Sequence, residues 1–435
     1  EWYQHLFSNK KFYIGSVFIP VCWVVVYYLQ GAYHEPYRRS RLNEFIQTLY
    51  TALIGVLILF FVLLLDDTIQ SYKNYYKSFS VLFSLQFVLT EIPRFILSSA
   101  TNHKIQKRKI GFKTLIIGSN ENAWNIYNEI QSLKDGNGNL FRGFIHIEER
   151  NGFSDKLVEK VPHLGELADL ARIIKQHHIE EIIIALESTE HNYIQQILND
   201  TIDLDVRIKL IPGVYDILAG SVKFTSVIQA PLIELNREIA PRWQINAKRI
   251  FDVAFSVFVL ITFSWLFIIL AIIVKLTSKG SVFFSQERLG LHGKPFKIFK
   301  YRSMYIGSEK NGPALSSEND PRITPFGLFL RKTRLDEFPQ FINVLFGNMS
   351  IVGPRPERKF FADKIIAKAP HYKHLHRVRP GITSWGQVKF GYAENVDEMV
   401  QRLKYDLLYA ENMSLLVDIK IIIYTILIVF QGRGK

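Results

Sequence analysis

The sequence predicts a multi-domain membrane protein: a transmembrane α-helical bundle, then an α/β domain with a parallel sheet, then a mostly α-helical, membrane-associated domain. Three observations predict this order. Long apolar runs dominate the N-terminal part, short β-branched segments alternate with helical ones in the middle, and clustered charges follow a further apolar run near the end. A length of 435 residues suits about three domains, and changes in composition place their boundaries at 1–110, 111–240 and 241–435.

The N-terminal part is expected to cross the membrane three times. Its apolar runs are each close to the roughly 20 residues that span hydrocarbon, at 12–29, 45–65 and 79–97. Segments 37–41 and 103–109 are basic and segment 66–68 is acidic, so the positive-inside rule places both basic segments in the cytoplasm. Three spans place residue 1 outside, and an even number would need one more span upstream. Glu91 and Arg94 are expected to pair with each other within the third helix.

Lysine and arginine outnumber the acidic residues by 53 to 40, and the net charge of +13 indicates an anionic partner. The clustering of apolar residues favours a membrane, and no nucleic-acid partner is expected. The single cysteine, Cys22, lies in an apolar run, so disulfides contribute nothing to the fold of this chain.

The middle segment has the pattern of a doubly wound parallel sheet, which is a Rossmann-like fold. Strands and helices alternate, with strands expected at 113–118, 181–186 and 206–211 and helices at 121–133, 164–177 and 191–198. A dinucleotide site needs further glycines after Gly118, but Asn120 and Ala123 occupy those positions. Glu121 would also put negative charge beside a phosphate. A structural or regulatory role is therefore favoured over binding of NAD.

A fourth apolar run, 253–276, is long enough to cross the membrane. The domains before and after it are both expected in the cytoplasm, so a segment that enters one leaflet and returns is favoured over a plain span. The apolar tail 415–430 is short for a span and fits a helix that lies in the interface.

Carboxylates, arginines and prolines crowd together between residues 320 and 357. Asp336 and Glu337 are adjacent and are bracketed by cations, which is an arrangement suited to holding a metal ion and a diphosphate together. The alternative is an ordinary helix start, because acids near a helix N-terminus and a proline such as Pro339 in its first turn are common.

Several motifs in this region occur together in one order: Val282-Phe283-Phe284-Ser285-Gln286-Glu287-Arg288-Leu289-Gly290, Phe299-Lys300-Tyr301-Arg302-Ser303-Met304, Asp320-Pro321-Arg322-Ile323-Thr324, Asp336-Glu337-Phe338-Pro339-Gln340, Val352-Gly353-Pro354-Arg355-Pro356-Glu357 and Arg379-Pro380-Gly381-Ile382-Thr383-Ser384-Trp385-Gly386-Gln387-Val388. On these motifs the chain from Lys248 to its end resembles the long-form polyprenyl-phosphate hexose-1-phosphate transferases, which initiate bacterial exopolysaccharide and O-antigen synthesis. In that family the membrane segment usually carries a proline after a serine. Here Trp265 follows Ser264, so the bend would rest on the hydroxyl of Thr262 or Ser264 bonding a backbone carbonyl.

The resemblance implies a two-step reaction at the bacterial inner membrane, with the catalytic domain facing the cytoplasm. Asp336 would attack the sugar-bearing phosphate of a UDP-sugar and expel UMP, and a polyprenyl phosphate would then take the sugar phosphate. Glu337 would hold Mg²⁺. Further phosphate contacts are expected from basic residues of the motifs: Arg322, Arg355, Arg302, Lys300 and Arg288.

Two alternatives to this function remain. A non-catalytic membrane scaffold of a polysaccharide assembly complex would release no UMP, and a glycosyltransferase that moves the sugar alone would release UDP. The identity of the hexose, the role of the Rossmann-like domain and the oligomeric state, a homo-oligomer included, stay open.

Overall fold

The computed structural model describes most of the chain, namely residues 10–34, 37, 41–64, 72–132, 138–147, 154–186, 191–202, 204–212, 232–235, 239–308, 312, 320–391 and 393–431. The acidic loop 66–68 and residues 38–40 of the basic loop lie outside them. The chain divides into two compact units. One holds the N-terminal helices and most of the sheet domain, and the other holds Glu234–Lys435 with two short stretches of the middle domain.

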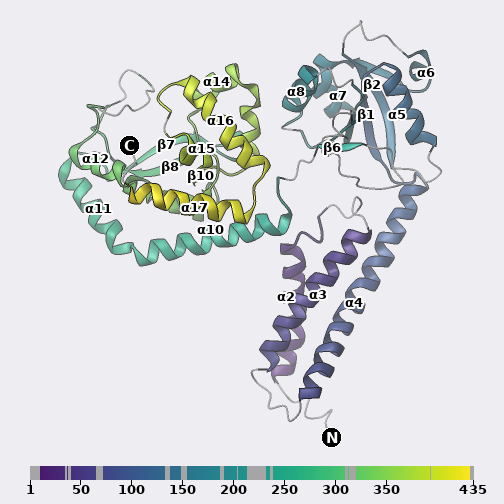
Figure 1. Cartoon of the computed structure of the whole chain (residues 1–435), viewed down its shortest axis with the longest axis horizontal. Helices are drawn as coiled ribbons and strands as arrows, with labels where there is room; N and C mark the ends of the chain where they lie inside the picture. Colours follow the sequence, from purple (N-terminus) through teal and green to yellow (C-terminus); the bar gives the residue numbers. More distant parts are fainter. Residues whose placement is uncertain are drawn as a thin grey trace. The chain divides into compact units, whose positions relative to one another are not determined.

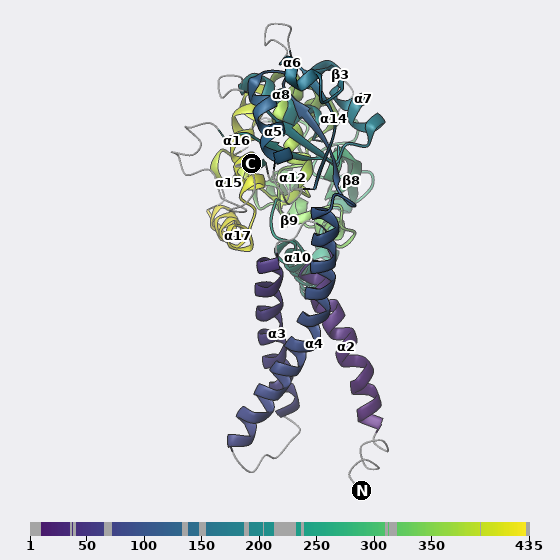
Figure 2. The same cartoon turned by 90° about the vertical axis from the view of Figure 1, so that its right-hand side faces the viewer.

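The N-terminal apolar runs form helices α2 (Lys10–Leu29), α3 (Arg41–Leu64) and α4 (Tyr72–Gln106), and α3 packs along α4 (Figures 1 and 2). Among the described residues, α3 and α4 are long and apolar enough to cross a membrane, whereas the apolar part of α2 is shorter. A third span results if the bent helix pair described below counts as one. The three predicted runs are thus helical, and two of them reach the length of a span.

The surroundings of Arg94 in α4 differ from the expected ion pair. Its guanidinium lies 4.1 Å from the centre of the Tyr27 ring, and its Nη1 donates to the hydroxyl of Thr48 at 3.2 Å. Among the residues that the structure describes, none forms a hydrogen bond with the buried Oε2 of Glu91. The predicted pair is therefore wrong, because α2 and α3 supply partners to Arg94 that a pattern within one helix does not reveal.

The middle domain is a six-stranded sheet in the order β3-β2-β1-β4-β5-β6 with helices on both faces (Figure 1). The pairs β1–β2, β1–β4 and β2–β3 are parallel, which confirms the doubly wound, Rossmann-like prediction. Leu115, Phe144 and Ile183 are fully buried, as expected for strands covered on both faces. The elements are β1 (Phe112–Ile117), α5 (Glu121–Ser132), β2 (Asn139–His146), α6 (Asp155–Val158), β3 (His163–Glu166), η3 (Leu167–Asp169), α7 (Leu170–His177), β4 (Glu181–Ile184), α8 (His191–Asp200), β5 (Arg207–Leu210) and β6 (Ile233–Leu235).

The loop after β1 is held by hydrogen bonds and by a close backbone contact within the domain. Gly118 has φ of 127°, and a Cβ there would lie 2.9 Å from the carbonyl oxygen of Ala185. Oδ1 of Asn120 accepts from the backbone N–H of Ala123 at 3.2 Å and so caps α5. The backbone N–H of Ser154 donates to Ser119 at 2.8 Å. These contacts fit the structural role that the incomplete glycine fingerprint favours.

The C-terminal domain begins with two apolar helices and surrounds its small sheets with helices (Figure 1). The hairpin β7–β8 is antiparallel, whereas β9 and β10 pair in parallel. The elements are α10 (Arg242–Thr262), α11 (Ser264–Thr277), β7 (Phe283–Leu289), η4 (Leu291–Gly293), β8 (Pro295–Tyr301), α12 (Pro325–Lys332), η5 (Leu335–Glu337), α13 (Gln340–Leu345), β9 (Ser350–Val352), α14 (Lys359–Lys368), η6 (Pro370–Arg377), β10 (Gly381–Thr383), α15 (Trp385–Lys389), α16 (Val396–Glu411) and α17 (Leu415–Phe430).

Helices α10 and α11 are bent by 65° at Phe263. At this residue φ is −100° and ψ is 15°, while the helical hydrogen bonds from Phe263 to Val259 and from Phe267 to Phe263 are kept at 3.0 Å. The rings of Phe263 and Phe267 pack on Phe338, with centroids 6.3 and 5.3 Å away. Among the described hydrogen bonds none comes from the hydroxyl of Thr262 or Ser264, so aromatic packing accompanies the bend in place of the expected hydroxyl contact.

Both arms of the bent pair pack on the same domain. In α10, Nζ of Lys248 lies 2.6 Å from Asp418 of α17, and Asp252 accepts from the hydroxyl of Ser350 at 2.7 Å. Beyond α11, the guanidinium of Arg302 donates to the carbonyl of Ser278 at 2.7 Å. The bent pair is thus either a broken span or a re-entrant segment, with both arms held against one domain.

Candidate active site

The acidic pair lies in a tight turn that follows helix α12. Thr324 caps the start of α12, because its hydroxyl accepts from the N–H of Gly327 at 2.9 Å, and Pro325 occupies the first turn. After α12, Arg334 adopts φ of 58° and ψ of 17°, a left-handed conformation that is uncommon outside glycine. It leads into the single turn η5, which carries both acids. The residue that caps α13 is Pro339, with no side-chain cap, so neither acid serves as an ordinary helix cap.

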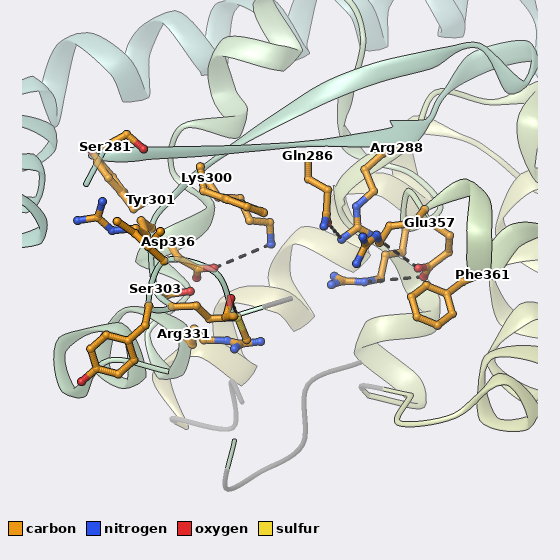
Figure 3. A pocket seen from close by; sticks show the side chains of 18 of the residues that line it. Ser281, Gln286, Arg288, Lys300, Tyr301, Ser303, Arg331, Asp336, Glu357 and Phe361 are labelled. Carbon is orange, nitrogen blue, oxygen red and sulfur yellow. Dashed lines mark hydrogen bonds and ion pairs between the residues drawn. The ribbon is translucent and has the colours of Figure 1, made fainter. Parts of the chain in front are cut away.

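Asp336 and Glu337 are buried beside one lysine. Their exposed fractions are 7% and 6%. Lys300, from strand β8, places Nζ 2.8 Å from Oε1 of Glu337. The same Nζ lies 3.9 Å from Oδ2 of Asp336 (Figure 3). One cation therefore faces two carboxylates, and the three groups form a compact polar centre.

The surroundings of the two carboxyl groups give them different pKa values. Burial raises the pKa of Asp336 to about 6, against the pull of Lys300 and with a further push from Glu337. Burial also acts to raise the pKa of Glu337, but Lys300 and nearby arginines together outweigh it and lower that pKa. At neutral pH Glu337 holds its charge against Lys300, whereas Asp336 is the more basic carboxylate. Two neighbouring acids with separated pKa values suit different roles.

A cavity of about 700 Å³ adjoins the pair, and cations outnumber acids in its lining. Asp336 and Glu357 contribute acids to its wall, and the cationic lining is Arg288, Lys300, Arg302, Arg331, Arg355, Arg358 and Arg402. Figure 3 shows Lys300 and Asp336 at one end, and Arg288 and Glu357 at the other. Such a lining suits a ligand with several negative charges.

The far end of the cavity is built around Glu357, of which 3% is exposed. Arg402 donates to its carboxylate at 2.6 Å, and guanidinium nitrogens of Arg288 and Arg355 lie 3.6 and 3.9 Å away. We call Glu357 with these three arginines the arginine cluster. Asp406 lies on α16, as does Arg402, and accepts from the N–H of Gly386 at 2.9 Å. Burial raises the pKa of Asp406 to about 6.

The structure brings some of the predicted residues together and places others elsewhere. Lys300, Arg288 and Arg355 reach the cavity beside Asp336 or in the arginine cluster. Arg302 lines the cavity, but its guanidinium donates to the carboxyl end of α11. Arg322 is held by Asp320 at 2.6 and 2.8 Å and is not among the lining residues, so phosphate binding by Arg322 stays a prediction from the sequence.

Three further side chains of the site did not stand out in the sequence. Glu357 closes a predicted motif, but nothing there showed that it would gather arginines. Arg402 and Asp406 lie on α16, far along the chain, where an Arg and Asp four residues apart read as a solvated pair. Only folding shows that both are buried.

The fold and the site define a class: a membrane protein with a cavity that several cations line and a buried acidic pair beside bent apolar helices. The bacterial sugar transferase family matches residues 243–432, and a CoA-binding domain matches residues 28–212. The chain belongs to the bacterial sugar transferase family, which confirms the resemblance carried by the motifs.

Curated relatives share this region. An undecaprenyl-phosphate N-acetylgalactosaminephosphotransferase of Aeromonas hydrophila that uses UDP-N-acetylgalactosamine is 41% identical over 43% of this chain and 44% of its own. A UDP-glucose:undecaprenyl-phosphate glucose-1-phosphate transferase of Klebsiella pneumoniae is 34% identical over 62% of this chain and 58% of its own. One of the same name from Caulobacter vibrioides is 38% identical over 41% of this chain and 68% of its own. The chain spans about half the length of the first two.

Proposed function

We propose that the chain transfers hexose-1-phosphate from a UDP-sugar to a polyprenyl phosphate and releases UMP, as the first step of exopolysaccharide or O-antigen synthesis. The observation that carries this proposal is the buried pair Asp336–Glu337, held by Lys300 at one end of a cavity lined by arginines. The relatives named for sugar-phosphate transfer to undecaprenyl phosphate support it.

The transfer takes place in two displacements. In the first, a carboxylate oxygen of Asp336 bonds to the phosphorus that carries the sugar, and the bond from that phosphorus to the bridging oxygen breaks, so UMP leaves with the electron pair. In the second, an oxygen of the polyprenyl phosphate bonds to the same phosphorus, and the bond to Asp336 breaks and restores the carboxylate. Two steps suit a water-soluble donor and a lipid acceptor.

Each reacting group is an anion, so fixed positive charge must offset the repulsion. Lys300 lies beside the acids, and Arg288 and Arg355 of the arginine cluster face the same cavity. Guanidinium groups bind phosphate oxygens in a fork that lysine cannot reproduce. We assign phosphate binding to these three residues.

The acidic pair fits Mg²⁺ when a substrate supplies further ligands. Among the described residues no group of three or more His, Cys, Asp or Glu side chains is arranged to hold a metal ion. Mg²⁺ is commonly held by one or two carboxylates together with substrate phosphates and water, and Asp336 and Glu337 offer two carboxylates. Glu337 is the proposed protein ligand. When bound, Mg²⁺ supplies charge neutralisation at the phosphates.

We also propose a role for each domain of the chain. Catalysis resides in 241–435, the segment 253–276 enters one leaflet of the bacterial inner membrane and returns, and this domain faces the cytoplasm. Domain 1–110 anchors the chain, and domain 111–240 has a structural or regulatory role. The packing of both arms of the bent pair on one domain supports the membrane arrangement.

The reaction has an acid limit set by Asp336. Its attacking form is the carboxylate, so kcat/KM is expected to fall as pH drops through about 6, the raised pKa of this group. Lys300 lowers that pKa, so Lys300→Gln is expected to move the acid limit to higher pH as well as to slow the reaction. A pH profile of UMP release measures both effects.

Lys297→Gln serves as a matched control, because Lys297 is an exposed residue of the same strand. An acid limit that is the same in the Lys300 and Lys297 variants would contradict the assigned electrostatics.

A burst experiment tests the proposed function itself. Purified protein in detergent with Mg²⁺ and a panel of UDP-hexoses, without acceptor, is expected to release one equivalent of UMP with the accepted sugar, and to turn over when polyprenyl phosphate is added. Release of UDP would indicate transfer of the sugar alone. Release of no nucleotide from any sugar, with acceptor present, would support the scaffold alternative.

A further inference from the structure

Exposed apolar side chains border the cavity, and one of them, Phe284, is the cross-strand partner of Lys300 beside Asp336. Phe284, Tyr305 and Ile306 line the cavity, yet 44%, 50% and 69% of their respective surfaces are exposed. We call these three residues the apolar rim. Large apolar groups exposed at the mouth of a charged cavity mark a contact with an apolar ligand or with lipid.

The apolar rim continues directly into the end of membrane helix α11. Gly280, just beyond α11, has φ of 124°, and a Cβ there would lie 2.6 Å from Cδ1 of Ile306 and 2.3 Å from Nη1 of Arg302. Arg302 in turn holds Ser278. On α11 itself Leu276 is 80% exposed. Ile306, which lines the cavity, therefore lies next to the segment that leaves the end of α11.

Other residues that line the cavity at the Asp336 end are polar. Ser281 and Ser303 lie at the same end as Asp336 and Lys300 (Figure 3), and all four line the cavity. An apolar surface that leads to hydroxyls, a lysine and the acidic pair is complementary to a molecule with a long hydrocarbon chain and a phosphate head. At the other end, the apolar lining residue Phe361 lies beside Glu357 (Figure 3) and is only 6% exposed.

We propose that the apolar rim is the passage along which the acceptor lipid reaches Asp336. The prenyl chain lies across Phe284, Tyr305 and Ile306 and continues along α11, and its phosphate enters between Ser281 and Ser303 toward the aspartyl phosphosugar. There a phosphate oxygen bonds to the phosphorus as the bond to Asp336 breaks. The UDP-sugar does not use the rim. This inference rests on the proposed function and deepens it.

The two half-reactions allow the rim to be tested separately from the chemistry. Ile306→Asp places a charge on the path and is expected to raise KM for the polyprenyl phosphate about tenfold or more. The burst of UMP without acceptor is expected to keep its amplitude. Ile306→Leu restores an apolar surface and is expected to restore acceptor KM. With a short-chain prenyl phosphate, which does not cover the rim, the Asp variant and the wild type are expected to converge.

Leu328→Asp is the matched control. Leu328, on α12, is 53% exposed and lies outside the cavity lining, so its variant reports a general loss of contact with the bilayer or detergent. An unchanged acceptor KM in Ile306→Asp, or an equal rise in Leu328→Asp, would overturn the proposed passage. Absence of a UMP burst from the wild-type protein would instead count against the proposed function.

Discussion

Replacing Asp336 by asparagine is expected to abolish UMP release, with a fall of about 10⁴-fold or more. The carboxamide has nearly the same shape but cannot form the acyl phosphate, so both displacements are lost. The wild-type protein, quenched during turnover with a UDP-sugar and analysed by mass spectrometry, should carry a sugar phosphate on residue 336, and the variant should carry none.

The same change at an exposed site controls for the loss of one negative charge. Asp363 on α14 is exposed, and Asp363→Asn is expected to leave the UMP rate unchanged. Undiminished turnover in Asp336→Asn would refute the covalent mechanism. An adduct on another residue would refute the assignment of the nucleophile.

Arg402→Met is expected to cause the largest loss of stability. It leaves the carboxylate of Glu357 buried without its 2.6 Å partner, and breaking a buried pair costs about 3–5 kcal/mol. Arg288 and Arg355 lie farther from Glu357 and offset part of this, so the lower end of the range is expected. Thermal unfolding of the detergent-solubilised protein measures the effect.

Two further variants test whether the loss of stability comes from the buried charge of Glu357. Arg377→Met removes an ion pair to Glu411, which is 53% exposed, and is expected to cost at most about 1 kcal/mol. The double change Arg402→Met with Glu357→Gln removes the buried charge as well and is expected to recover part of the lost stability. An equal loss in the Arg402 and Arg377 variants would contradict the view that burial makes the Glu357 contact expensive to break.

Much of this architecture follows from local patterns. Apolar runs and the alternation of strands and helices depend on neighbours in sequence, so the helical segments and the doubly wound sheet were predictable. The acidic pair was found because Asp336 and Glu337 are adjacent and sit among unusual motifs. The pairing of Lys300 with both acids was not predictable, because β8 and η5 meet only through the tertiary fold.

Two features escaped prediction because they depend on contacts between segments distant in sequence. Arg94 contacts Tyr27 and Thr48, which lie on other helices, in place of the expected pair with Glu91. Phosphate binding by Arg322 stays a prediction, and in the structure Arg322 is held by Asp320, two residues away. In that case a short-range contact competes with the role that the resemblance implies. Arg402 reaches Glu357 across 45 positions of sequence, and no local pattern reports such a meeting.

The bend at Phe263 has a consequence for how the chain enters its membrane. No proline fixes the angle, and the ring that meets Phe263 and Phe267 belongs to Phe338, which is synthesised much later. A peptide that contains only these two helices lacks the Phe338 ring. We expect such a peptide to form one straight apolar helix. We therefore expect the angle at Phe263 to be set only after Phe338 has been made and has packed on these rings.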